Sequence, residues 1–328
     1  MCSSAEAPGL GGLTRRRHDG QVVNISGKVV DQVVQLARAR LSGALRDKVA
    51  GQDAEERARA IWQSPGERWF GPADPVWRVH ADASMFVGGI RALLLQSLHP
   101  LAMAGVAGHS GYKSDPWGRL QRTSAYLATT TFGTAQAAEE TIAHVRSIHE
   151  RVRGTSVDGR PYAASDPHLL GWVHAAEADS FLAAHQRHGR QALTAGEADE
   201  FVRQSGLVAA RLGVVDPPRS VAELDRLLAA YRPELGGTPA AFEAARFLLL
   251  HPPLGWPDRP GYAALAAGGV ALLPMWAKEM LRLPVLPMTE RLAARPVAEL
   301  AVRAVRWALD DPRDPRNPRV RSGVAQPA

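Results

Sequence analysis

The segment IAHVRSIHERVRG, residues 142–154, carries two histidines five positions apart on an expected helix. At about 100° per residue their side chains point roughly 140° apart, so His144 and His149 cannot hold one metal ion from a single face. His149 falls in the apolar stripe that includes Ile142 and Val145, whereas His144 falls nearer its edge. The first feature to explain is therefore an imidazole in an apolar stripe.

Two further histidines, His99 and His174, each stand alone among apolar residues. His174 shares a helical stripe with Leu170, Val173 and Phe181. Most such histidines are hydrogen-bonded residues of a core. The alternative is an axial haem ligand, because the porphyrin supplies four nitrogens and one iron–imidazole bond completes the attachment. Spacing alone permits both interpretations.

A basic face follows from the sequence RLQRT, which supplies Arg119, Arg122 and Thr123. Their i, i+3, i+4 spacing puts all three on one side of a helix. Cationic and hydroxyl groups of this kind are suitable partners for the propionates of a haem. The simpler interpretation is a solvated helix face that happens to include a threonine.

Several common chemistries lack their sequence patterns. The chain has no Gly-x-Gly-x-x-Gly turn after a strand, no phosphate-binding loop of the Walker type and no Gly-x-Ser-x-Gly elbow. Its single cysteine, Cys2, excludes a disulfide framework, a zinc knuckle, an iron–sulfur cluster and a thiolate-ligated haem. Nucleotide binding and acyl transfer are thus unsupported.

The metal-binding motifs of helical proteins are also incomplete. No Glu-x-x-His pair of the di-iron type occurs. His149-Glu150 begins like a His-Glu-x-x-His zinc site, but Arg153 occupies the fifth position. His185 and His188 share a face among polar neighbours, which predicts a solvated surface pair.

The net charge of +6 and a pI near 9.9 come mainly from scattered arginines. They cluster only in TRRRH and DPRDPRNPRVR, close to the two ends, so we expect no nucleic-acid partner. No secretory signal is visible, and the longest apolar run, AALAAGGVALLPMWA, is shorter than the roughly 20 residues of a membrane span. These features predict a cytoplasmic protein without a transmembrane span.

The elements that must position these residues are helices. Periodicity predicts one all-α domain over residues 29–310, between a flexible segment, 1–28, and a Pro/Arg-rich tail, 311–328. MFVGGIRALLLQSLHP is expected to be a central buried helix that Pro100 ends. The His149 helix is expected to run to Gly154 as its C′ residue, followed by a small hairpin in TSVDGRPYAA and a long helix capped by Ser165 or Asp166.

An ordered series of motifs resembles the superfamily of MpaB and the rubber oxygenases, or latex-clearing proteins. The resemblance covers roughly residues 65–185. It rests on GPADPVWRVH, LLLQSLHPLAMAGV, DPWGRLQRTSAYL, VRSIHERVRG and YAASDPHLLGWVHA. Members of this superfamily are all-α proteins that hold a b-type haem through a histidine on a helix after an Arg-x-x-basic-Thr motif.

Applied to this sequence, the resemblance implies a haem b whose iron is bound by His149. His144 is the second choice of iron ligand. Arg119, Arg122 and Thr123 match the Arg-x-x-basic-Thr motif and would act beside the haem as catalytic and cofactor-binding residues. His99 and His174 would be cofactor-pocket residues.

By the same resemblance, the expected function is a haem-dependent oxygenase that activates dioxygen and acts on a hydrophobic, alkene or isoprenoid-like substrate. A non-catalytic haem- or lipid-binding helical protein is the alternative. One departure concerns the acidic residue that rubber oxygenases use as a base near the haem. Between His99 and Arg119 the only carboxylate is Asp115, in a turn. This departure argues against the rubber-cleaving mechanism, whereas the general oxygenase interpretation still stands.

Overall fold

A computed structural model describes residues 54–109 and 114–310, together with residues 35, 36, 38–43, 45, 47–49 and 51. The predicted flexible segment, 1–28, and the predicted tail, 311–328, lie outside these residues. The described residues from Arg38 onward belong to one compact unit. The domain boundaries drawn from the sequence stay a prediction.

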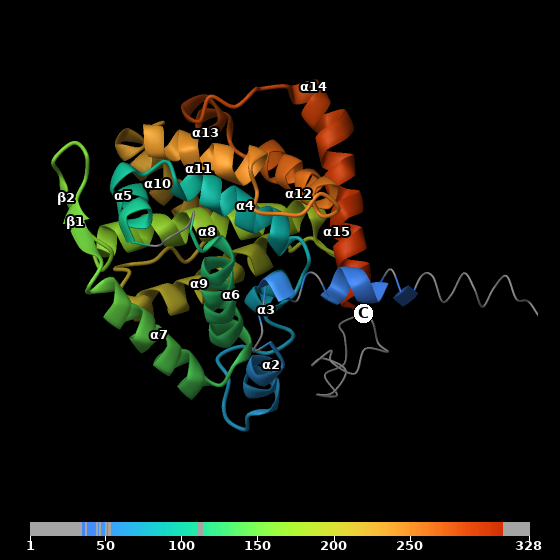
Figure 1. The fold of residues 1–328 in the computed structure, drawn as a ribbon. Coiled ribbons are helices and arrows are strands. Elements are labelled where there is room, and N and C mark those ends of the chain that lie inside the picture. Colours follow the sequence, from blue (N-terminus) through green and yellow to red (C-terminus); the bar gives the residue numbers. More distant parts are fainter. Residues whose placement is uncertain are drawn as a thin grey trace, which may run out of the picture. The chain divides into compact units, whose positions relative to one another are not determined.

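The all-α prediction is confirmed. Within the described residues the only strands are β1 (Arg153–Thr155) and β2 (Pro161–Ala163), and every other element is a helix (Figure 1). The helices are α2 (Ala54–Gln63), α3 (Pro75–His80), α4 (Met85–Gln96), α5 (Pro100–His109), α6 (Pro116–Phe132), α7 (Ala135–His149), α8 (Pro167–His188), α9 (Ala195–Leu212), α10 (Val221–Tyr231), η1 (Arg232–Glu234), α11 (Pro239–Leu250), α12 (Arg259–Leu272), α13 (Met275–Met280), α14 (Pro287–Thr289), η2 (Glu290–Ala294) and α15 (Arg295–Leu309).

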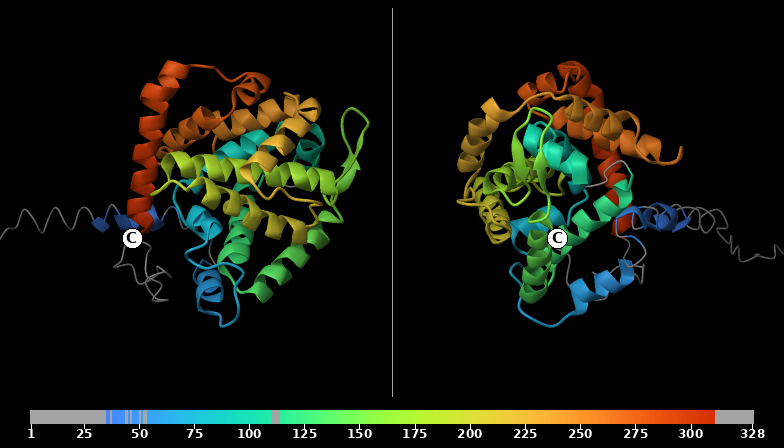
Figure 2. Two further views of the ribbon diagram at one scale, coloured as in Figure 1. Left: turned by 180° about the vertical axis from the view of Figure 1, so that it is seen from behind. Right: turned by 60° about the vertical axis from the view of Figure 1, so that its left-hand side comes forward.

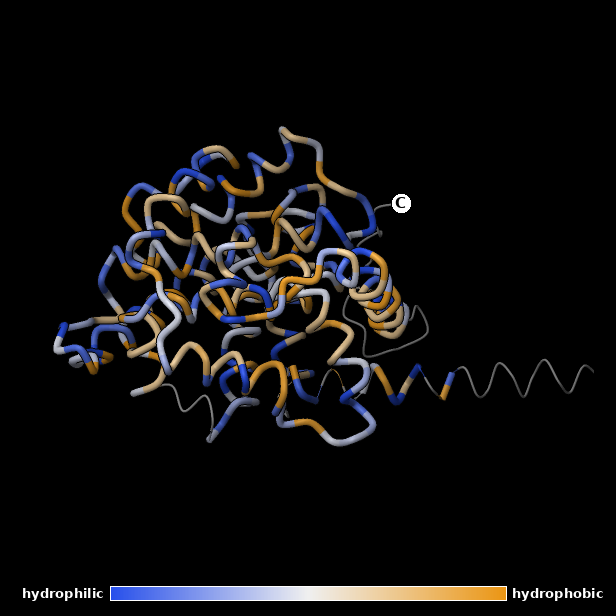
Figure 3. Tube along the Cα trace, turned by 90° about the horizontal axis from the view of Figure 1, so that it is seen from above, coloured by the Kyte–Doolittle hydropathy of each residue, from blue (hydrophilic) through white to orange (hydrophobic). Residues whose placement is uncertain are grey.

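Helices α4 and α8 form the centre of the core and share the largest helix–helix interface (Figures 1 and 2). Gly88 lets them approach, because a Cβ there would lie 2.7 Å from the ring of Phe181. Helix α12 packs on α4, and α15 packs on α12. Apolar and polar stretches alternate along the trace in Figure 3, as expected for amphipathic helices around one core.

The predicted buried helix is α4, and the chain bends by 106° between α4 and α5. Pro100 begins α5, where the missing N–H of proline costs nothing. Among the described helices, none is by itself long and apolar enough to cross a membrane, and only the bent α4–α5 pair meets those criteria jointly. The bend places His99 between the two helices.

The predicted hairpin is present, but the end of the His149 helix differs from the prediction. Helix α7 ends at His149, and Gly154 lies in β1 opposite Tyr162 instead of capping a helix. Position 154 requires a glycine for a steric reason, because a Cβ there would lie 2.7 Å from the Tyr162 hydroxyl. The glycine thus makes room for a cross-strand tyrosine, and the left-handed residue of the hairpin is Gly159, with φ of 82°.

Candidate functional site

Helix α7 carries His149 as its last residue. The helix begins where the Thr134 hydroxyl accepts a hydrogen bond from the Ala137 N–H, and Ile142 is its most deeply buried large side chain. After His149 the chain turns, with the Val152 N–H donating to the His149 carbonyl at 3.1 Å, and enters β1. The imidazole is therefore held at the junction of a helix and a hairpin.

His149 is half-buried, and its Nδ1 atom is buried without a hydrogen-bond partner. Burial lowers its pKa, an effect that outweighs the opposing attraction of Glu150. The ring is consequently neutral at pH 7, although the end of a helix favours a protonated histidine. A neutral imidazole with an unbonded nitrogen facing protein has the electronic form that metal ligation requires.

Helix α8 carries a second unpaired histidine, His174, whose Nε2 atom is buried without a partner. Burial lowers the pKa of His174 to about 4. One turn further along, burial raises the pKa of Glu177 to about 7. Burial, and then the charge of Glu177, also raise the pKa of Tyr126 on α6. The region between α6 and α8 thus disfavours charge of either sign.

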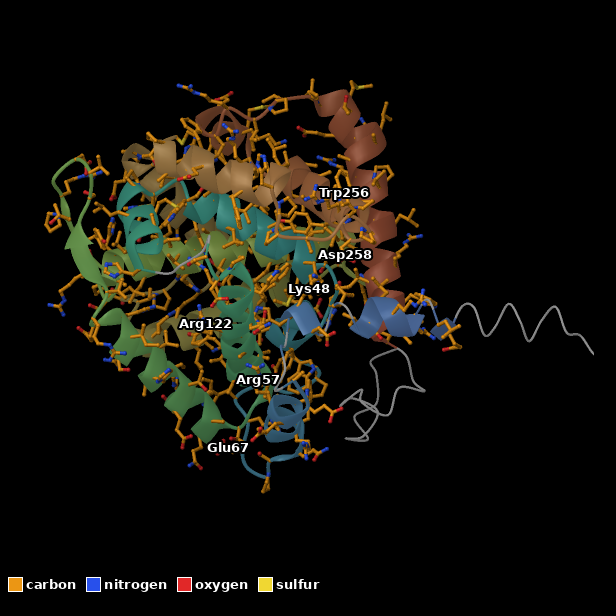
Figure 4. All side chains as sticks on the ribbon, in the orientation of Figure 1. Lys48, Arg57, Glu67, Arg122, Trp256 and Asp258 are labelled. Carbon is orange, nitrogen blue, oxygen red and sulfur yellow. The ribbon has the colours of Figure 1, made fainter. Side chains whose placement is uncertain are left out.

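The predicted basic face lies at the start of α6, where Asp115 caps the helix by accepting a hydrogen bond from the Gly118 N–H at 2.9 Å. Arg122, labelled in Figure 4, is exposed and pairs with Asp115 at 3.2 Å. Thr123 is exposed and Arg119 is half-buried. The Asp115 carboxylate therefore both caps the first turn and pairs with Arg122.

His99 is buried, with 1% of its surface exposed, at the bend between α4 and α5. Its ring lies 6.2 Å from that of Trp172 and 6.4 Å from that of Tyr231. Its neighbours include His168 and Glu234, which the sequence analysis did not single out. Only the fold brings Glu234, on η1, to these histidines, so no local pattern could have indicated it.

The second-choice ligand, His144, is exposed on α7. The predicted solvated pair is wrong, because His185 and His188 are 3% and 1% exposed. His185 Nε2 bonds the Gln191 carbonyl at 3.1 Å, and His188 Nδ1 bonds Glu299 on α15 at 2.9 Å. Their polar sequence neighbours suggested water, but the helix face is covered by distant segments of the chain.

An open surface depression lies beside α2, lined by Glu56, Arg59, Ala60, Gln63, Ser64 and Pro65. None of the predicted site residues lines it. The enclosed haem pocket expected from the sequence therefore stays a prediction.

Comparison with protein families matches residues 77–307 to the model described as "ER-bound oxygenase mpaB/B'/Rubber oxygenase, catalytic domain". The match spans more than half of the chain and includes α4 to α8 with all seven predicted site residues. The chain belongs to this family. No curated protein and no solved structure matches it significantly.

Membership in the MpaB and rubber-oxygenase family confirms the suspected relationship and extends it through the C-terminal helices to α15. The protein accordingly carries an oxygenase-type catalytic domain, which makes it an enzyme whose reactants are a small molecule and oxygen. The residues that perform the reaction were predicted from sequence motifs, and the comparison does not assign them.

Proposed function

We propose that this protein is a haem b-dependent oxygenase that uses dioxygen to attack a hydrophobic, alkene or isoprenoid-like substrate, with the iron held by His149. The observation that carries the proposal is the unpartnered, buried Nδ1 atom of His149 on a ring kept neutral by burial. Leaving a buried polar atom unbonded costs about 1–3 kcal/mol. A ligand at that nitrogen would offset this cost.

The residues present fit a haem in two further respects. Arg119 and Arg122 offer positive charge on the first turns of α6, suited to propionates. In addition, three half-buried side chains on α6 and α8 have pKa values shifted mainly by burial: His174, Glu177 and Tyr126. This combination is expected of side chains that line an enclosed, poorly hydrated space.

A bound haem would supply the iron centre at which dioxygen is activated. The residues of the chain have separate tasks. His149 provides an uncharged donor nitrogen, and the apolar side chains of α4 and α8 exclude water from a hydrophobic substrate.

Glu177 is suited to proton transfer. Rubber oxygenases use an acidic residue on another segment as the base. With a pKa raised to about 7, its carboxyl group is half-protonated at neutral pH and can both accept and donate a proton. His174, one turn away, stays neutral there and adds no competing charge.

The test is the absorption spectrum of the purified protein, supplied with haem if necessary, compared with His149→Ala and His144→Ala. His144 lies on the same helix and is exposed, so it is a matched control. We expect a Soret band that His149→Ala abolishes or shifts and that His144→Ala leaves unchanged. No band in the wild-type protein, or a band indifferent to His149→Ala, would overturn the proposal.

Turnover distinguishes an oxygenase from a protein that only binds haem or lipid. Oxygen uptake should rise when an isoprenoid alkene is added to the wild-type protein, and should stay at background with the saturated analogue. A haem-loaded protein that consumes no oxygen with any alkene of a size series would favour the non-catalytic alternative.

A further inference from the structure

Three side chains outside the proposed iron site converge at the bend between α4 and α5. His99, His168 and Glu234 each present one nitrogen or oxygen atom, and these atoms lie within 4.8 Å of one another. His168 Nε2 lies 2.9 Å from both carboxylate oxygens of Glu234, and His99 Nε2 lies 3.5 Å from Glu234 Oε2. It is the one such cluster of potential ligands found in the described part of the chain.

Each of the three residues comes from a different element, and backbone contacts hold the elements together. The Gly236 N–H, just after η1, donates to the Leu98 carbonyl at 2.9 Å. The Tyr231 hydroxyl, at the end of α10, donates to the His168 carbonyl at 2.7 Å. The cluster is therefore preorganised by the fold.

His99 is the most deeply buried member of the cluster. The residue is 1% exposed, and its buried Nε2 atom has only a long contact, 3.5 Å, with the Glu234 carboxylate and no well-formed hydrogen bond. Buried polar atoms are nearly always well bonded, and a metal ion between His99 and Glu234 would replace this weak contact with two short ones.

We propose that His99, His168 and Glu234 bind a first-row divalent transition-metal ion, for which Zn²⁺ is the natural probe. Two imidazoles and one carboxylate are a common ligand set for Zn²⁺, and the exposed side of the cluster leaves a position for water. Neither the family assignment nor the iron proposed at His149 enters this inference.

The distances suit the ion after a small adjustment. With bonds of about 2.0–2.1 Å, tetrahedral ligands lie about 3.3 Å apart. The His99–Glu234 separation of 3.5 Å is close to this value, whereas the His168–Glu234 separation of 2.9 Å must widen. Both of the latter side chains can move, because they are 53% and 43% exposed.

Binding of the metal ion would break one weak hydrogen bond of His99. Its Nδ1 atom accepts from the Ala102 N–H at 3.5 Å, the outer limit of a hydrogen bond. With the metal on Nε2 the ring proton must sit on Nδ1, so this contact is lost. The ion would replace it by joining the α4–α5 bend, the start of α8 and η1 around Trp172.

The experiment measures Zn²⁺ binding by titration calorimetry and thermal unfolding in full-length protein stripped with EDTA, which leaves a haem in place. We expect one ion per chain, and a melting temperature about 5 °C higher when Zn²⁺ exceeds its Kd 100-fold. Glu234→Gln and His168→Asn should each weaken binding at least tenfold. His251→Asn, which changes an exposed histidine outside the cluster, is the control and should bind normally.

Both test positions are exposed, so these variants are expected to fold, which circular dichroism checks. Wild-type protein that binds no Zn²⁺, or Zn²⁺ binding that is equal in wild type, Glu234→Gln and His168→Asn, overturns the proposal. The Soret spectrum, recorded in the same samples, reports on His149 separately, so the two proposals fail independently.

Discussion

Two pairs of histidines in this molecule differ in their hydrogen bonding. Each of the four has one ring nitrogen buried without a partner: Nδ1 of His149 and His185, and Nε2 of His174 and His188. The other ring nitrogen of His185 bonds the Gln191 carbonyl, and that of His188 bonds Glu299 on α15. The second pair is therefore anchored by a side-chain hydrogen bond that the first pair lacks in the described part of the chain, which leaves the first pair more available to a ligand.

The bonded pair belongs to a polar network that attaches α15 to the rest of the domain. Arg306 donates to both oxygens of Asp82, at 3.0 and 3.3 Å, and to the His188 carbonyl at 2.7 Å. Burial opposes ionisation of Asp82, but the hydrogen bonds from Arg306 and Ser84 hold its pKa below the usual value. The two pairs therefore predict different responses to substitution and pH.

The largest expected effect comes from breaking this network. Arg306→Met leaves the Asp82 carboxylate, which is 4% exposed, without its partner, and should lower the free energy of unfolding by about 3–5 kcal/mol. The matched control, Arg303→Met, removes an exposed partner of Glu299 and should cost less than about 1 kcal/mol. Urea unfolding measures both, and equal effects would mean that the network is not structural.

The unbonded pair predicts a pH dependence. The pKa of His174 is about 4 in the folded chain and about 6.5 when unfolded, so between these values only the unfolded chain takes up the proton. The free energy of unfolding should fall as the pH drops from about 6.5 to about 4, by up to about 3 kcal/mol for this group. His174→Asn should flatten that slope, as followed by urea unfolding across the window.

For His188, the interaction with Glu299 opposes the lowering of the pKa by burial. His188→Asn should therefore flatten the slope less than His174→Asn does. If the two variants change the slope equally, the distinction between bonded and unbonded histidines loses its energetic basis.

Glu177 predicts a slope of the opposite sign. Its folded pKa of about 7 exceeds the unfolded value of 4.5, so stability is complete below about pH 4.5 and is lost as the pH rises through 7. Glu177→Gln should accordingly be more stable than wild type at pH 8, by up to about 3 kcal/mol, and should slow oxygen uptake if the carboxyl handles protons. Glu243→Gln, at an exposed glutamate on α11, is the control.

The local chemistry of the chain could be predicted, and its long-range pairings could not. The cap of the long helix α8 was predicted at Ser165 or Asp166 and is Asp166, because caps are contacts between near neighbours. Helix α2 was missed, since only Ile61 of its residues is buried and the apolar stripe is weak. Gly154 was misassigned because a C′ glycine and a strand glycine look alike until Tyr162 is seen opposite.

The same limit applies to the candidate site. His149, His99 and His174 were selected correctly as buried or half-buried imidazoles, because their neighbours in the sequence are apolar. The burial of His188 depends on Glu299, 111 residues away, and Glu234 meets His168 across 66 residues. No periodicity within a helix encodes such pairs, so sequence reasoning assigned the first to solvent and overlooked the second.

The most direct test of the central claim asks whether the His149 side chain itself is the iron ligand. His149→Gly removes the imidazole, and free imidazole added to the variant can occupy the space. We predict that the Soret band of the wild type is lost or shifted in His149→Gly and returns with imidazole. A wild-type spectrum that persists in His149→Gly, or recovery by imidazole in His174→Gly instead, would contradict the account.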